Sequence, residues 1–161
     1  MTPGDVKEVV LTMSPANFIL IGDPTENKRH PANTIDAQFS AYFQVAHALL
    51  YGAKTGDMTL YSRLEDPAIH ELTEKITVQT DAAMKQFATR MRVVWADGEV
   101  DEGGLEIPLG EVERPFGKEL VEEKFRNLAV PVIGGDRAEK VLRTVEELEK
   151  HSVGELMELL R

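Results

Sequence analysis

One segment, residues 36–51, constrains the fold more than any other part of the sequence. Placed on a helix, it carries apolar side chains around most of its circumference: Ala37, Phe39, Ala41, Phe43, Val45, Ala46, Ala48, Leu49 and Leu50. Asp36 is a favourable N-cap, and Gly52 suits the position after the last turn. The stretch is far too short to span a bilayer. The sequence therefore predicts a helix from Asp36 to about Tyr51 that is buried on most sides.

The length and composition of the chain exclude several classes of protein. The chain has 161 residues, of which 42% are hydrophobic and 29% charged, as in a globular protein of one domain over residues 1–161. It has no cysteine, which excludes disulfide scaffolds and thiolate metal sites. The formal charge of −10 disfavours nucleic acid as a partner. No signal peptide or membrane span is recognisable, so we expect a cytoplasmic protein.

The first half of the chain predicts a strand, a loop and two helices. Residues 5–13 are rich in β-branched residues and predict a strand, which residues 16–21 could extend or pair with. Residues 22–34 read as a polar loop before the central helix. The pair Asp66–Pro67 predicts the start of a second, shorter helix.

The second half predicts an antiparallel region followed by helices. Strands are expected at 76–80, 90–96 and 105–112, with a turn at Asp97–Gly98 and a mobile tip or connection at Gly103–Gly104. Helices are expected at 118–129, from Asp136 onward, and after the capping box Ser152–Glu155. Together these elements predict an α+β fold, a two-layer sandwich of an antiparallel sheet with helices.

Three groups of residues could carry chemistry, and each has an ordinary structural alternative. Ser40, Gln44, His47 and Tyr51 form a polar stripe that faces either a pocket or partner, or simply solvent. The basic cluster Lys28–Arg29–His30 could bind a carboxylate or belong to an exposed loop. The seven acidic residues between Asp97 and Glu113 lack the order of a calcium loop. The four histidines show no zinc-site spacing, so no metal is predicted.

Several segments together resemble one family. The stretch from Pro31 to Gly52, with DAQFS at 36–40, resembles the signature of the MmgE/PrpD family. Further segments fit in the same order, over roughly residues 5–160: Asp66–Ile69, Lys75–Val78, Val93 with Asp97–Gly98, Pro115, Glu119–Leu120 and Lys124–Phe125. The family includes 2-methylcitrate dehydratase, cis-aconitate decarboxylase and iminodisuccinate epimerase. The resemblance implies proton transfer on a small polycarboxylate, without metal or other cofactor.

The resemblance also implies that the chain is one part of an active site. Family members have a large helical N-terminal domain, which supplies most acid–base residues, and a smaller α+β domain; this chain resembles only the latter. We therefore expect a C-terminal domain or small subunit of a lyase that is inactive without a helical partner. Its catalytic residues are expected on that partner, and six residues of this chain are candidates for one wall of the site: Arg29, His30, Gln38, Ser40, Tyr42 and Phe43. Assembly of the chain with itself is left open.

One departure from the family pattern bears on this expectation. Members often carry a tyrosine three residues after the signature serine, where this chain has Phe43 beside Tyr42. Neighbouring residues on a helix point about 100° apart, so Tyr42 does not simply replace that tyrosine. Either the helix is rotated or the chain functions without the hydroxyl. The alternative hypothesis is an interaction or regulatory module that kept the fold and lost the chemistry.

Overall fold

The computed structural model describes residues 1–161, which divide into two compact units. Unit 1 comprises residues 1–53 and 59–115, and unit 2 comprises residues 54–58 and 116–161. The chain therefore leaves unit 1 after the central helix, contributes a short segment to unit 2, and returns.

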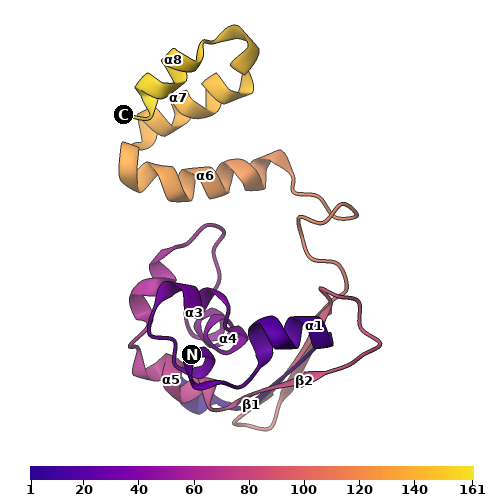
Figure 1. The fold of residues 1–161 in the computed structure, drawn as a ribbon. Helices are drawn as coiled ribbons and strands as arrows, with labels where there is room; N and C mark the ends of the chain where they lie inside the picture. Colours follow the sequence, from indigo (N-terminus) through magenta and orange to yellow (C-terminus); the bar gives the residue numbers. More distant parts are fainter. The chain divides into compact units, whose positions relative to one another are not determined.

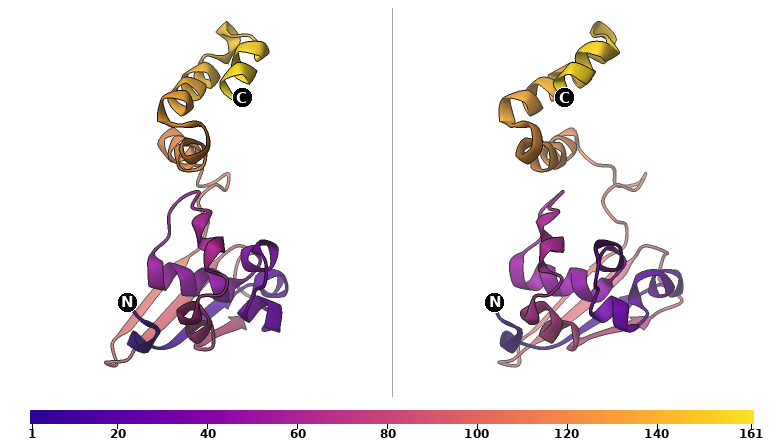
Figure 2. Two further views of the ribbon diagram at one scale, coloured as in Figure 1. Left: turned by 90° about the vertical axis from the view of Figure 1, so that its left-hand side faces the viewer. Right: turned by 60° about the vertical axis from the view of Figure 1, so that its left-hand side comes forward.

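Unit 1 is an α+β sandwich, as predicted, with helices packed against one face of a four-stranded sheet (Figures 1 and 2). The strands are β1 (Val6–Met13), β2 (Ile76–Thr80), β3 (Thr89–Trp95) and β4 (Val100–Leu105), in the order β2-β1-β3-β4. The sheet is mixed rather than wholly antiparallel, because β2 runs parallel to β1. A parallel pair needs a long crossover, which the intervening helices supply.

The core lies between β1 and the helices. Alternate residues Val9, Leu11 and Met13 of β1 are buried, whereas Val10 and Thr12 lie on the opposite, more open face. They pack against buried residues of the helices, including Phe43, Ile69 and Leu72. Burial of each large side chain contributes about 1.5–3 kcal/mol, so the central helix anchors the unit.

A short helical segment begins at Pro15, directly after β1, and the predicted central helix is in fact two helices. Unit 1 contains η1 (Pro3–Asp5), α1 (Pro15–Asn17), the π-helix η2 (Phe18–Gly22), α2 (Glu26–Arg29), α3 (Thr34–Gln38), α4 (Ala41–Tyr51), η3 (Thr59–Arg63) and α5 (Pro67–Thr73). Asn33 caps α3, and Ser40 caps α4. The prediction of one helix capped by Asp36 was wrong, because Ser40 adopts an extended conformation between the two. The end at Gly52, with φ of 81°, was predicted correctly.

Other boundaries also differ from the predictions. Residues 16–21 form helical turns rather than a strand, and residues 22–34 contain α2. The strand predicted at 105–112 lies instead at 100–105, because Gly98, with φ of 94°, completes a tight turn after β3. The pair Gly103–Gly104 therefore lies within β4, opposite Met91 and Arg90, and not at a tip.

Unit 2 is helical. It contains α6 (Lys118–Ile133), α7 (Gly135–Glu146), η4 (Leu148–Lys150) and α8 (Val153–Leu159), and the predicted capping box Ser152–Glu155 opens α8. Gly134, not Asp136, is the N-cap of α7. Arg126 of α6 contacts Glu139 of α7 at 2.6 Å.

The segment from Lys54 to Met58 packs on α6 and is called the strap below. The side-chain amide of Asn127 donates to the Thr55 carbonyl over 2.8 Å. Gly56 adopts φ of 71° against Lys124 and Leu128. None of the helices in the structure is long and apolar enough to cross a membrane.

Candidate active-site wall

Ser40 organises the signature segment. Its hydroxyl accepts a hydrogen bond from the Phe43 N–H at 2.9 Å and donates one to the Lys28 carbonyl. The first bond caps α4, and the second joins the 28–30 segment to that helix. Because Ser40 is buried, both backbone groups would lose their partner without it. The predicted site residue Ser40 therefore holds the 28–30 segment against α4 from a buried position.

Tyr42 and Phe43 are also buried, with 1% and 0% of their surfaces exposed. The Tyr42 hydroxyl donates to the Gly22 carbonyl over 3.0 Å. Burial raises the pKa of this hydroxyl, and the positive charge of Arg29 opposes the shift. The phenol of Tyr42 is thus engaged in the core, and it does not stand in for a hydroxyl at position 43.

Arg29 links the signature segment to α5. Its guanidinium donates to the Thr73 carbonyl over 3.0 Å and lies 4.6 Å from the centre of the Tyr42 ring. It also lies 4.0 Å from the Glu74 carboxylate. A guanidinium has five N–H donors, so Arg29 keeps donors that a ligand carboxylate could use.

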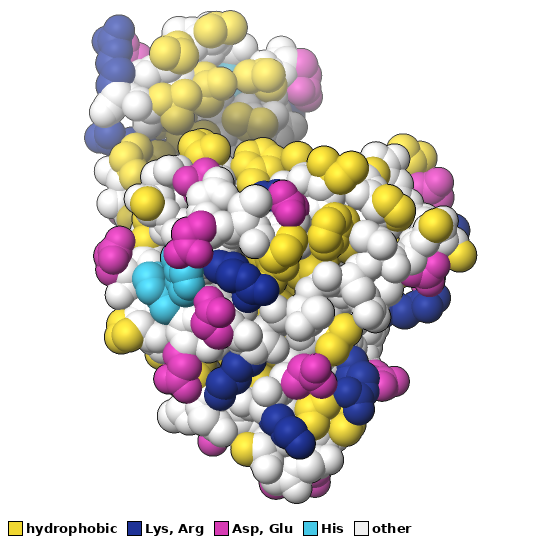
Figure 3. Space-filling model, turned by 60° about the horizontal axis from the view of Figure 1, so that its bottom comes forward, with side chains coloured by type: hydrophobic (Ala, Val, Ile, Leu, Met, Phe, Trp, Pro, Cys, Tyr) yellow, Lys and Arg dark blue, Asp and Glu magenta, His cyan; other side chains and the backbone are white.

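His30 forms a cluster with Glu74 and His70. Its Nε2 lies 2.9 Å from a carboxylate oxygen of Glu74, and its ring is 4.8 Å from the ring of His70. A carboxylate oxygen accepts, so Nε2 donates this hydrogen bond. The other ring nitrogen of His30, Nδ1, is buried and has no hydrogen-bond partner. Histidine, acidic and basic side chains are visible side by side on one face in Figure 3.

Gln38 is the one candidate whose side chain is exposed, and it lies at the end of α3. Two large apolar residues near it are exposed as well, Ile35 of α3 at 63% and Phe39, which directly follows α3, at 45%. Residues four positions apart share a helix face. The signature segment therefore presents an apolar surface with an amide beside it.

The polar stripe on α4 is divided in the structure. Ser40 and His47 are buried, and Gln44 donates to the Ala37 carbonyl over 3.0 Å. Tyr51 is exposed and donates to Asp66 over 2.6 Å. That hydrogen bond is the main cause holding the pKa of the Asp66 carboxyl below its usual value, and the Ala68 N–H contributes. The stripe thus serves mainly to join α4 to its neighbours.

Sequence reasoning missed Thr73 and Glu74, which receive Arg29 and His30. Each lies 44 positions along the chain from its partner. The spacing of His70 and Glu74 was a usable signal, since residues four apart meet on a helix. No group of three or more His, Asp or Glu side chains is arranged to hold a metal ion.

Comparison with known proteins identifies the family of the chain. A family model described as the MmgE/PrpD C-terminal domain matches residues 1–150. This chain belongs to the MmgE/PrpD family. The MmgE/PrpD chain is also similar to the cis-aconitate decarboxylase-like protein oryM of Aspergillus oryzae, with 26% identity over 155 residues. The match covers 93% of this chain and 32% of the relative. The chain therefore spans about a third of the length of that relative.

Proposed function

We propose that this chain is the C-terminal domain or small subunit of an MmgE/PrpD-type lyase that acts on a small polycarboxylate. The observation that carries the proposal is the family match over residues 1–150, together with a relative named as cis-aconitate decarboxylase-like. In this proposal a helical partner domain supplies the acid–base groups, and the present chain forms one wall of the site.

The wall has two layers. Gln38 and His30 lie at its surface side, where the Gln38 amide is available for a substrate oxygen. Arg29 offers its remaining N–H groups to a substrate carboxylate, which guanidinium binds well. Ser40, Tyr42 and Phe43 lie beneath and set the positions of the others. The exposed Ile35 and Phe39 would contact the helical partner.

The test is to assay the chain alone and mixed with the helical N-terminal part of a family member. The reactions are dehydration of 2-methylcitrate, which removes a proton and hydroxide, and decarboxylation of cis-aconitate, which releases carbon dioxide and adds a proton. We expect turnover only in the mixture. Full activity of the isolated chain would contradict the proposed division of roles.

A paired substitution tests the wall itself. In the active mixture, Gln38→Ala should raise KM for the polycarboxylate, because a substrate hydrogen bond is lost. Gln86→Ala, which changes another exposed glutamine of the same unit, should leave KM unchanged. An equal effect of both substitutions on KM would contradict a contact between Gln38 and the substrate.

The alternative is a non-catalytic interaction or regulatory module. It is favoured by Phe43, which is buried and has no hydroxyl, and by the engagement of Arg29 with Thr73 and Tyr42. Light scattering separates the two proposals. A folded species that binds neither a helical partner nor polycarboxylates supports the module, whereas a chain that associates with the partner supports the subunit.

A further inference from the structure

Glu74 places its carboxylate beside two candidate residues of the wall. One carboxylate oxygen lies 2.9 Å from Nε2 of His30, and the other lies 4.0 Å from Nη1 of Arg29. Arg29 and His30 follow one another at the C-terminal end of α2, so a single carboxylate faces both. Guanidinium and imidazole N–H groups are donors that suit a carboxylate. The structure thus already holds a carboxylate at the place where the wall would bind one.

The position of Arg29 does not depend on this carboxylate. Its Nη1 donates to the Thr73 carbonyl over 3.0 Å, and its guanidinium lies 4.6 Å from the centre of the Tyr42 ring. The 4.0 Å separation from Glu74 is too long for a hydrogen bond. If the Glu74 side chain moved away, the guanidinium would therefore stay in place, with N–H groups left to donate.

Glu74 itself is placed where its side chain can move. The residue directly follows α5 as its C-cap, and its side chain is exposed. Exposed ion pairs contribute little to stability, because water solvates both charges well. A carboxylate supplied by a ligand can therefore displace the carboxylate of Glu74 from Arg29 and His30.

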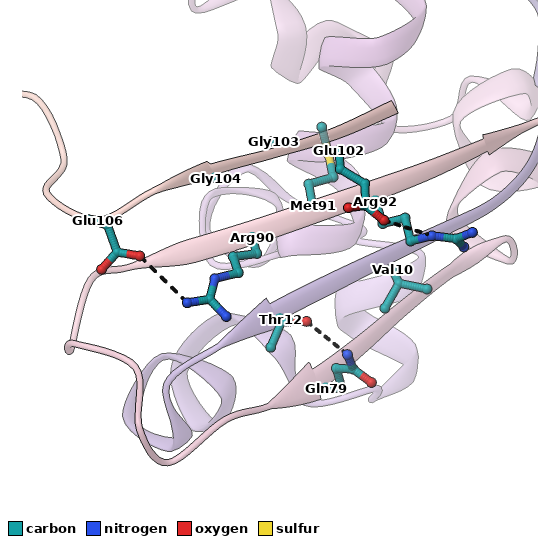
Figure 4. A pocket seen from close by; sticks show the side chains of 10 residues that line it. All are labelled: Val10, Thr12, Gln79, Arg90, Met91, Arg92, Glu102, Gly103, Gly104 and Glu106. Carbon is teal, nitrogen blue, oxygen red and sulfur yellow. Dashed lines mark hydrogen bonds and ion pairs between the residues drawn. The ribbon is translucent and has the colours of Figure 1, made fainter. Parts of the chain in front are cut away.

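The arginines on the open face of the sheet are engaged differently. Arg90 and Arg92 line a hollow of about 530 Å³ on that face (Figure 4). Arg92 donates a hydrogen bond directly to the Glu102 carboxylate over 3.1 Å. The direct hydrogen bond of Arg29 goes instead to a neutral carbonyl, and only the more distant Glu74 opposes its charge. Arg29 is therefore better prepared than Arg92 to receive a new carboxylate.

We propose that Glu74 is an internal competitor of the substrate. Its carboxylate occupies the position beside Arg29 and His30 that a carboxylate of the polycarboxylate takes on binding. The inference rests on the proposed function, since it concerns the same wall. Binding moves the Glu74 side chain toward solvent, and the negative charge of Glu74 lowers the affinity of the wall for anions.

The first test measures citrate binding to the chain alone, followed by the amide NMR signals of Arg29 and His30. We expect Glu74→Gln to bind citrate about fivefold more tightly than the original chain, because the amide oxygen still accepts from His30 but carries no charge. Glu8→Gln is the matched control and should leave this affinity unchanged. Glu8 also lies 4.0 Å from an arginine, Arg92, and its side chain is 52% exposed, against 56% for Glu74. Unchanged or weaker binding by Glu74→Gln, or no response of the two signals in either protein, would overturn the proposal.

Ionic strength separates the effect of charge from an effect of shape. The difference in citrate affinity between Glu74→Gln and the original chain should shrink when the salt concentration is raised to about 1 M, because salt screens exposed charges. A difference that persists in high salt would contradict competition by the charge of Glu74.

The lyase assay in the mixture with a helical domain distinguishes this inference from the proposed function. In an active mixture, Glu74→Gln should lower KM for the polycarboxylate, and an unchanged or higher KM would contradict the competitor alone. Absence of turnover in every mixture would contradict the proposed function, while the citrate titration would still decide whether Glu74 competes with anions.

Discussion

At the scale of single residues, the Ser40 hydroxyl forms two structural hydrogen bonds, one of which caps α4. Ser40 is the last residue of the link between α3 and α4, where its hydroxyl caps α4, and it donates a hydrogen bond to the Lys28 carbonyl at the same time. Asn33 caps the preceding helix in a similar way, but from an exposed position. The two residues thus allow the cost of a buried cap to be compared with that of an exposed one.

We expect Ser40→Ala to lower the free energy of unfolding by about 2 kcal/mol, because a cap is lost and two buried backbone groups are left without partners. Asn33→Ala should cost about 1 kcal/mol or less, because water can replace the cap. Urea unfolding of both variants checks the comparison. Equal losses would show that the bond to Lys28 contributes nothing measurable.

The hydrogen bond between Tyr51 and Asp66 should make stability depend on pH. The lowered pKa of Asp66 means that the contact stabilises the protein fully above the usual carboxyl pKa of 3.8, and that this stabilisation is lost as pH falls through the folded-state pKa. Tyr51→Phe should therefore destabilise the chain more at neutral pH than in acid. For Tyr61→Phe, the difference from the original chain should be the same at both pH values.

At the scale of elements, some helices and strands follow from the local sequence pattern, and others depend on contacts with the rest of the chain. The capping box Ser152–Glu155, the Asp66–Pro67 start of α5 and the β2 strand follow from local sequence and were predicted. The apolar residues of η2 suggested a strand, but packing against Met13 and Val78 accommodates a π-helix ending at Gly22. Strand β4 has two glycines and two acidic residues, and pairing with β3 overrides that composition.

The strap is held by a glycine whose conformation and surroundings both matter. At Gly56, φ is 71° and an added Cβ would lie 3.1 Å from Lys124 Cγ and 3.2 Å from its carbonyl oxygen. We expect Gly56→Ala to release the strap from α6, seen as faster proteolysis within residues 54–58. Gly52→Ala is the matched control, because φ there is 81° but nothing lies within 4 Å. Similar cleavage of both variants would show that backbone strain alone, not the contact with α6, is responsible.

At the scale of the whole molecule, the fold class was predictable but the details of the candidate wall were not. The alternation in β1 and the apolar helix were enough to indicate an α+β sandwich. The hydrogen-bond partners of Arg29 and His30 lie in or directly after α5, far along the chain. No local sequence pattern therefore predicts these contacts. Burial of Tyr42 and Phe43 follows from packing on both sides of α4.

The path of the chain also gives unit 2 a redundant attachment. Residues 54–58 belong to unit 2, while the residues on both sides of them belong to unit 1. A single cut in the connection before Phe116 would therefore leave two fragments still joined by the grip of α6 on the strap, through Asn127 and the pocket around Gly56. The helical unit is therefore held to unit 1 both by the connection before Phe116 and by the strap, which begins shortly after the end of α4.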